Sequence, residues 1–424
     1  MEIKNRLVIC IWLPALFFCA CPSDPPGPPA EKAYRVEILW EREVKSPSAD
    51  PLIEGQYCYL PAYENYPGGG RNIVKINMEE NGRVEWESRG IGYSSIEKPQ
   101  KIGAHIYVLN SGFIYVFNDS DGKLAATVML GEDETEAADN AIGYYSPAAV
   151  SGQYLFWGNA PALSNFTRGL MRLNSELIDF SKAPGEIQTI TPELVWSNSW
   201  GARIYLNLIS EDGILYFLTR SYMPENPSVL AAVDDETGDV IWEGEAPHCQ
   251  GYRDFSLVLN GEKLLVVEVV INDEGFNEGT FSSYDKSTGT PVLENISVGN
   301  GIGNFRYDSI ALYNNRLFYS DAWGLVSVDA DTGRLIWDIS AWSFLPMFPN
   351  DQTSIYFHSS PLVNDGKVFI MHATGLRVYN ADTGKFIGVD KSFQERWTSG
   401  IAIYKDTYIF FNGRLNYVTA IRCK

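Results

Sequence analysis

The chain has few of the residues that build metal sites and disulfide frameworks. Its 424 residues include six cysteines and four histidines. After Cys21 only Cys58, Cys249 and Cys423 remain, without C-x-x-C spacing, and the histidines form neither an i,i+4 pair nor an H-E-x-x-H motif. We therefore expect no metal site and no disulfide framework, although Cys58 and Cys423 could pair if the ends of the domain meet.

Basic residues are also scarce. Lysine and arginine number 33 against 53 acidic residues, which gives a net charge of -20. Such a surface repels phosphate backbones, so nucleic acid is excluded as a partner. Only 20% of the residues are charged, whereas 45% are hydrophobic, so the chain can fill a large core. Abundant glycine and tyrosine favour strands and turns, and we expect a mostly β protein.

The N-terminus resembles an export signal. Lys4 and Arg6 precede an apolar run, Leu7 to Ala20, that is too short to cross a bilayer as a helix. We interpret residues 1–20 as a signal peptide that ends in a lipobox, which makes Cys21 the acylated residue. Residues 21–33 are rich in proline and predict a tether, and residues 34–424 predict a single domain. The expected location is the bacterial cell envelope, with the membrane reached through the lipid on Cys21.

The domain contains an internal repeat. The sequence AVDDETGDVIW, which ends at Trp242, recurs as SYDKSTGTPVL, SVDADTGRLIW and YNADTGKFIG. Degenerate copies precede these around Gly122 and before Trp86. The four clear threonines, Thr237, Thr288, Thr332 and Thr383, are separated by 51, 44 and 51 residues, a spacing typical of one four-stranded propeller blade per repeat.

The repeated motif predicts a hairpin. Its Asp or Asn begins a turn by accepting hydrogen bonds from backbone amides, and its glycine supplies a positive φ. The strand that follows carries a tryptophan, which we expect to lie against the next blade. These tryptophans are Trp40, Trp86, Trp196, Trp242 and Trp337.

Counting the apolar runs gives eight units, and the last of them has only three strands. The segment around Trp40, from Tyr34, has the character of an outer strand and no blade before it. We expect it to complete the eighth blade and so close the ring. The predicted fold is all-β, a monomeric eight-bladed propeller of antiparallel blades, with units starting near residues 51, 99, 147, 204, 254, 309, 361 and 400.

These motifs resemble the quinoprotein-like propeller superfamily over residues 34–424. One branch of it, the pyrroloquinoline quinone (PQQ) dehydrogenases, holds a quinone and Ca²⁺ at the centre, typically under a disulfide of adjacent cysteines. No two cysteines after Cys21 are neighbours, and no haem C-x-x-C-H motif occurs. The chain looks more similar to the other branch, the BamB-type outer-membrane assembly lipoproteins, which are non-enzymatic. The resemblance implies no catalysis and no cofactor.

The segments between blades are the candidate binding face. All carry aromatic residues and most contain glycine, a composition typical of recognition loops, although these rings could also plug the channel. Separately, residues 132–139 hold five acids that could gather Ca²⁺, but the spacing lacks an EF-hand pattern and favours a solvated loop. The candidate binding residues are Tyr93, Tyr145, Trp200, Tyr252, Phe305, Tyr307, Trp342, Phe344 and Trp397.

The sequence thus predicts a lipid-anchored propeller that binds a protein or peptide, or a glycan, at the cell envelope. Two alternatives stay open. One is a carbohydrate-binding or small-ligand sensor lipoprotein, and the other is a degenerate PQQ-dependent dehydrogenase. Fold by itself does not decide between binding and catalysis.

Overall fold

A computed structural model shows how the chain folds. It divides the chain into two units, Met1–Glu31 and Lys32–Lys424, and the described residues all lie in the second. Cys21 and the segments predicted as signal peptide and tether lie outside the described residues, except for Ala33. The described residues are 33–44, 51–63, 71–91, 98–141, 148–159, 169–197, 203–204, 208–220, 228–246, 256–271, 277–300, 310–320, 324–340, 361–372, 375–393, 400–405, 407–412 and 416–422.

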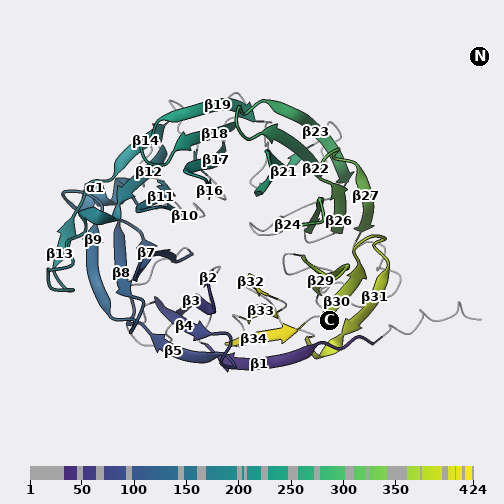
Figure 1. The fold of residues 1–424 in the computed structure, drawn as a ribbon, viewed down its shortest axis with the longest axis horizontal. Coiled ribbons are helices and arrows are strands. Elements are labelled where there is room, and N and C mark those ends of the chain that lie inside the picture. Colours follow the sequence, from purple (N-terminus) through teal and green to yellow (C-terminus); the bar gives the residue numbers. More distant parts are fainter. Residues whose placement is uncertain are drawn as a thin grey trace, which may run out of the picture. The chain divides into compact units, whose positions relative to one another are not determined.

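The described residues form eight sheets arranged as a ring (Figure 1). Within each sheet, neighbouring strands run antiparallel from the inner to the outer strand, except for one added strand in the second sheet, Ile187–Thr189, which pairs in parallel. This is the predicted eight-bladed propeller. The predicted unit starts are confirmed, since the inner strands begin within two residues of seven of them, and the fourth unit begins with two short inner strands.

The first four blades contain the following strands. Blade 1 is β2 (Leu52–Glu54), β3 (Tyr57–Tyr63), β4 (Arg71–Asn77) and β5 (Arg83–Glu87). Blade 2 is β6 (Gln100–Ile102), β7 (His105–Asn110), β8 (Phe113–Asn118), β9 (Leu124–Met129) and, from later in the chain, β13 (Ile187–Thr189). Blade 3 is β10 (Ala148–Ser151), β11 (Tyr154–Gly158), β12 (Gly169–Asn174) and β14 (Glu193–Ser197). Blade 4 is β15 (Arg203–Ile204), β16 (Ile209–Glu211), β17 (Ile214–Arg220), β18 (Ser228–Asp234) and β19 (Val240–Ala246).

The remaining blades follow the same order. Blade 5 is β20 (Ser256–Asn260), β21 (Lys263–Ile271), β22 (Asn277–Asp285) and β23 (Pro291–Asn300). Blade 6 is β24 (Ile310–Tyr313), β25 (Arg316–Ser320), β26 (Gly324–Asp329) and β27 (Leu335–Ser340). Blade 7 is β28 (Leu362–Asn364), β29 (Lys367–His372), β30 (Gly375–Asn380) and β31 (Phe386–Asp390). Blade 8 is β32 (Gly400–Tyr404), β33 (Thr407–Asn412), β34 (Tyr417–Arg422) and β1 (Glu37–Glu43).

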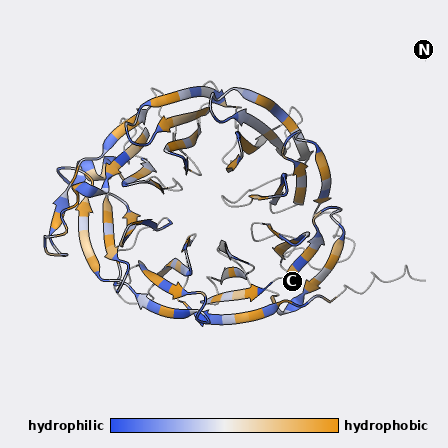
Figure 2. Cartoon of the chain, in the orientation of Figure 1, coloured by the Kyte–Doolittle hydropathy of each residue, from blue (hydrophilic) through white to orange (hydrophobic). Residues whose placement is uncertain are grey.

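The hydrophobic core lies between the blades. The described residues form eight buried clusters, and each cluster draws on two neighbouring blades. Strand β17 shows the reason, because Tyr216 and Leu218 pack toward blade 5 while Leu215 and Phe217 pack toward blade 3. Successive side chains of a strand point to opposite faces, so both faces of a middle strand are buried. Figure 2 shows the resulting hydrophobic stretches along the strands.

The ring closes through the N-terminal strand. Strand β1 pairs antiparallel with β34, from Glu37 opposite Arg422 to Glu43 opposite Tyr417. The predicted closure is therefore confirmed. The residues just before β1 also reach blade 7, because the Tyr34 amide donates to the Val389 carbonyl at 3.0 Å.

Two elements differ from the sequence-based expectations. The acidic segment was expected as a solvated loop, but Glu134–Asp139 forms a short helix, α1, whose N-cap is Asp133. The Asp133 side chain accepts hydrogen bonds from the amides of Thr135 and Glu136. The acidic residues in the first turn also stabilise the helix, because negative charge interacts favourably with the N-terminal end of the helix dipole. The other difference is β13, which follows the 3-10 helix η1 (Ser175–Leu177) and adds a fifth, parallel strand to blade 2. A second 3-10 helix, η3 (Lys391–Phe393), follows β31.

Candidate functional site

The predicted binding face lies outside the described residues. This applies to Tyr93, Tyr145, Trp200, Tyr252, Phe305, Tyr307, Trp342, Phe344 and Trp397 alike. Their role therefore stays a prediction. The structure instead describes the opposite strand ends, where tight turns join the first to the second strand in blades 1 to 7 and the third to the fourth strand in blades 1, 2 and 4 to 7.

The repeated motif is used to build these turns. In blade 4, Asp234 Oδ1 accepts hydrogen bonds from the Thr237 amide at 2.7 Å and the Glu236 amide at 3.1 Å. Asp285, Asp329 and Asn380 accept equivalent bonds in blades 5, 6 and 7. These bonds to backbone amides lower the pKa of Asp234, in line with a carboxylate that caps a turn. The motif residues therefore have a structural role, as the hairpin interpretation predicted.

The motif glycine and the outer-strand tryptophan form one contact between blades. A Cβ on Gly122, whose φ is +67°, would lie 2.5 Å from Cε3 of Trp86 in the preceding blade. Trp86 Nε1 also donates to the carbonyl of Asp119 at 2.8 Å. Trp242 and Trp337 make the same pair of contacts with the next blade, and Trp40 lies against Gly82. Trp196 packs on Phe217 instead, with ring centroids 5.1 Å apart.

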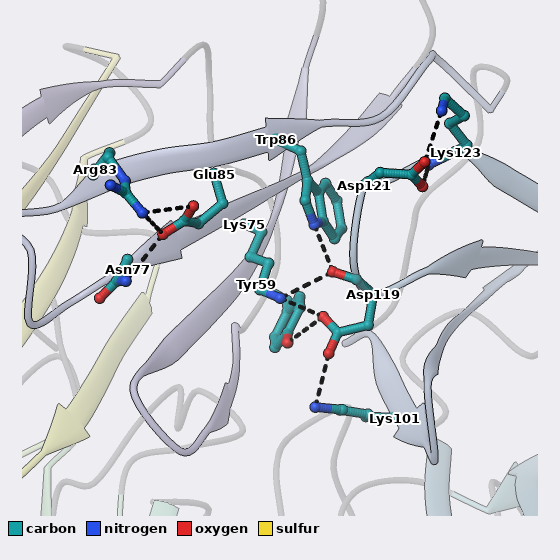
Figure 3. A network of polar contacts seen from close by, with 10 residues as sticks. All are labelled: Tyr59, Lys75, Asn77, Arg83, Glu85, Trp86, Lys101, Asp119, Asp121 and Lys123. Atoms are coloured by element: carbon teal, nitrogen blue, oxygen red, sulfur yellow. Dashed lines mark hydrogen bonds and ion pairs between the residues drawn. The ribbon is translucent and has the colours of Figure 1, made fainter.

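A charged network joins blades 1 and 2 (Figure 3). Asp119, in the turn between β8 and β9, accepts hydrogen bonds at 2.6 Å from both Tyr59 and Lys75 of blade 1. Its other oxygen, Oδ2, lies 3.0 Å from Lys101 Nζ. The Lys75 ammonium also lies 4.0 Å from the centroid of the Tyr57 ring. One carboxylate is therefore shared as the ion-pair partner of two lysines whose side chains are largely buried.

The pKa values of this network reflect its burial and its bonds. Burial tends to raise the pKa of Asp119, but the hydrogen bonds from Lys75, Tyr59 and Lys101 outweigh it and leave the pKa below the ordinary value. The pKa of Tyr59 is raised, first by burial and then by the bond to Asp119. At neutral pH the Asp119 carboxylate is therefore ionised and the Tyr59 hydroxyl is protonated, which is what a structural hydrogen bond between them requires.

Similar pairs join other blades at the same strand ends. Lys405 of blade 8 lies 2.5 Å from Glu79 of blade 1, and Lys286 of blade 5 lies 2.8 Å from Glu211 of blade 4. Two further pairs link blade 5 to blade 6 and blade 6 to blade 7. Charged groups on this side of the ring thus hold neighbouring blades together. The last two pairs are Lys263 with Asp331 at 2.7 Å and Arg316 with Asp382 at 2.7 Å.

The acidic segment is held by contacts within the protein. Glu136 accepts a hydrogen bond from the Glu132 amide at 2.6 Å, and Thr191 Oγ1 lies 3.4 Å from its other oxygen. Among the residues that the structure describes, no three His, Cys, Asp or Glu side chains are grouped so as to hold a metal ion. Cys58 is a buried free thiol whose pKa is raised by burial, and Cys423 lies outside the described residues.

The repeat does not predict the segment from Ser175 to Ile190, which we call the blade-3 insertion. It leaves the third strand of blade 3, places β13 beside β9 of blade 2 and returns to blade 3 at β14. It exposes the large apolar side chains of Leu177, Phe180 and Ile187. The signal available in the sequence was the missing Thr-Gly turn in the third unit, where the chain instead continues as SELIDFSKAPGEIQTI.

The blade-3 insertion also contacts the first turn of blade 2. The Phe180 ring stacks on His105, with centroids 4.2 Å apart and planes 2° apart. Burial lowers the pKa of His105, so the imidazole under Phe180 is neutral at pH 7. Within the described part of the chain, no helix is long and apolar enough to cross a membrane.

Comparison with known proteins agrees with the repeat and the fold. A family model described as outer membrane protein assembly factor BamB matches residues 225–402, the part that holds the four clear motif copies. No curated protein sequence matches the chain. The predicted resemblance to quinoprotein-like propellers is thus confirmed by this match and by the eight-bladed fold.

Several solved propellers superimpose on most of the chain. The computationally designed Ika8 protein has a TM-score of 0.59 at 11% identity, over 91% of this chain and 100% of its own. A quinohemoprotein alcohol dehydrogenase from Comamonas testosteroni has a TM-score of 0.58 at 10% identity, over 91% of this chain and 76% of its own. A europium-containing methanol dehydrogenase has a TM-score of 0.56 at 12% identity, over 88% of this chain and 84% of its own. At these identities the similarity concerns the fold alone.

Proposed function

We propose that this protein is a lipid-anchored binding module of the bacterial cell envelope that holds a protein or peptide partner and catalyses no reaction. The family match over residues 225–402, whose description names an assembly factor of outer membrane proteins, supports this function over an enzymatic one. The signal-like N-terminus and Cys21 support the location.

One observation carries the proposal: several carboxylates of the described residues hold neighbouring blades together. Asp119 is shared by Tyr59, Lys75 and Lys101, and Glu79 accepts from both Tyr404 and Lys405. Carboxylates that act in catalysis are instead typically poised near the working pH by burial or by a like charge. The pKa values of Asp119 and Glu79 are both lowered, which favours a scaffold.

The aromatic residues between the blades remain our proposed contact surface for the partner. Tyrosine and tryptophan provide a large contact area at low cost in conformational entropy, and a few such anchors usually dominate binding. We expect truncation of an anchor to cost about 2 kcal/mol or more of binding free energy. If the rings instead plug the channel, truncation lowers the melting temperature and leaves binding unchanged.

The test uses the full chain in its own cells. Partners are cross-linked in the envelope and recovered with the wild type and with Trp200→Ala, Trp342→Ala and Trp397→Ala, and the melting temperature of each purified variant is measured. Tyr417→Ala is a matched control, because Tyr417 is an exposed aromatic of strand β34. Selective loss of one partner in a tryptophan variant supports the proposal. Unchanged recovery together with a large fall in melting temperature contradicts it.

A quinone-dependent oxidoreductase is the second candidate, because two of the similar folds are alcohol and methanol dehydrogenases. Adding PQQ with Ca²⁺ to the purified protein and following dye reduction with alcohols separates the two functions. The binding function predicts no dye reduction above a protein-free control. A glycan array covers the third option, a carbohydrate-binding lipoprotein.

A further inference from the structure

The blade-3 insertion builds a strand edge that the repeat does not account for. Strand β13 pairs with β9 in parallel, with Gln188 opposite Val128, and the sheet order places β13 at the end of blade 2. Figure 1 shows β13 at the outside of the ring, next to β9. The Ile190 amide donates to the Met129 carbonyl, so in a parallel ladder the amides of the alternate residues Ile187 and Thr189 point away from β9.

Apolar side chains accompany this edge. Leu177 is 61% exposed, Ile187 is 54% exposed and Phe180 is 40% exposed. Most other exposed large hydrophobic residues of the described chain lie on outer strands spread around the ring, and Tyr417 lies on β34, whereas these three belong to one short segment. Exposed apolar side chains in a short segment that also carries an open strand edge are typical of a protein interaction site.

The segment is held firmly by residues other than the exposed ones. Gln188 is buried, and its side chain donates to the Asp179 carbonyl at 2.8 Å and accepts from the Asp179 amide at 2.9 Å. Ile178 is buried in the cluster between blades 2 and 3. The insertion therefore presents Leu177, Phe180 and Ile187 in a fixed arrangement, which reduces the entropic cost of binding.

The surroundings of the edge are acidic. Glu176, Asp179 and Glu186 are exposed within the insertion, and its Lys182 lies 3.4 Å from Glu186. Helix α1 adjoins the C-terminal end of β13, as the contact between Thr191 and Glu136 shows, and adds further acids. Figure 2 shows predominantly hydrophilic colour around α1. A complementary partner segment carries positive charge.

We propose that the open edge of β13 binds an extended, basic segment of a partner protein as an added strand. Main-chain hydrogen bonds to the outward-pointing backbone groups of Ile187 and Thr189 align the partner segment. The apolar side chains of that segment contact Leu177 and Ile187. Its lysines or arginines face the acidic residues of the insertion and of α1. This inference rests on the proposed binding function and specifies the partner segment as extended and basic.

The experiment measures peptide binding to the purified full-length protein. The probe is a short fluorescent peptide that alternates lysine with valine, and its counterpart alternates glutamate with valine. Fluorescence anisotropy is recorded for the wild type, for Ile187→Lys and for Thr189→Pro, which removes the outward amide. The control is Leu335→Lys, which makes the same charge change at a 42% exposed residue of another outer strand, β27.

We expect the basic peptide to bind the wild type and the acidic peptide not to bind. Ile187→Lys and Thr189→Pro should each weaken binding about tenfold or more, whereas Leu335→Lys leaves it within about twofold. Unaltered melting temperatures confirm that the variants fold. Absence of binding, or equal weakening by Ile187→Lys and Leu335→Lys, overturns the inference. Either result leaves the cross-linking test of the proposed function unaffected, because that test does not depend on this edge.

Discussion

The indole of Trp86 lies against Gly122 in the turn of the next blade, where a side chain would occupy the position of the ring. The same relationship joins Trp242 to Gly289 and Trp337 to Gly384. The glycine thus meets two demands at once, since its φ is positive and its α-carbon is covered by a ring. This explains why the tryptophan and the glycine recur together in the repeat.

The first prediction compares two glycines of blade 2. Gly122 and Gly103 have φ values of +67° and +58°, but a Cβ on Gly103 meets nothing within 4 Å. We expect Gly103→Ala to cost about 1 kcal/mol through backbone strain alone. Gly122→Ala adds a clash with Trp86 and should cost about 3 kcal/mol or more in the free energy of unfolding. Chemical denaturation of both variants measures the difference, and equal costs would show that the ring yields freely.

Sequence patterns predicted most of the fold because each repeat encodes its own hairpin. The Asp-x-x-Thr-Gly turn and the tryptophan that follows it located the outer strands of blades 4 and 6, and the lone strand around Trp40 predicted the closure. These are local signals, or follow from the need to cover a sheet edge. The blade-3 insertion could not be predicted in this way. Its strand β13 lies between the third and fourth strands of blade 3 in the sequence but pairs with β9 of blade 2.

The candidate site was less predictable than the fold. The motif predicts that an Asp or Asn begins each turn, yet nothing in the local sequence links Asp119 to Lys75, 44 residues earlier. Such pairs depend on which side chains meet where neighbouring blades pack. The repeat predicts the strands of each blade but not these contacts. The acidic run before Asn140 likewise favours a loop in the sequence, because the six residues of the observed helix are too few to give a periodic signal.

The second prediction concerns pH. Asp119 has a pKa below its ordinary value of 3.8, so its carboxylate stabilises the fold fully above about pH 4 and loses that effect as the pH falls through the lowered pKa. Asp119→Asn leaves Lys75 and Lys101 without their charge partner and should cost about 2 kcal/mol at pH 7. The difference in melting temperature between variant and wild type should shrink toward pH 2.

A neighbouring residue supplies the control for the pH prediction. Asp121 is in the same turn and its pKa is also lowered, chiefly by Lys123, but both side chains are well exposed. Solvent screens exposed pairs, so Asp121→Asn should change stability little at any pH. A melting difference for Asp119→Asn that stays constant from pH 7 to pH 2 would mean that its charge does not stabilise the fold.

The third prediction concerns the proposed anchor. Cys21→Ser removes the thiol that we propose to be acylated, so the protein should leave the membrane fraction or accumulate unprocessed. The protein is acidic overall, with a net charge of -20, so attraction to anionic lipid cannot replace the lipid anchor. Fractionation of cells and immunoblotting measure the distribution, with Cys249→Ser as the control. Undiminished membrane retention of Cys21→Ser would refute lipid anchoring at this residue.

The last prediction concerns closure of the ring. Deleting residues 34–43 removes strand β1, exposes the edge of β34 and takes away Trp40, which is 6% exposed, from the cluster between blades 8 and 1. It also removes Arg42, whose Nε donates to the Gly82 carbonyl of blade 1 at 2.9 Å.

Burial of one tryptophan alone is worth about 3–5 kcal/mol, and an open strand edge pairs readily with other molecules. We therefore expect a large fall in melting temperature together with aggregation, measured by calorimetry and size-exclusion chromatography. A chain that lacks residues 22–31 is the control, because that deletion leaves β1 in place, and it should melt like the parent. If the chain without residues 34–43 also melts like the parent, another segment must complete the eighth blade.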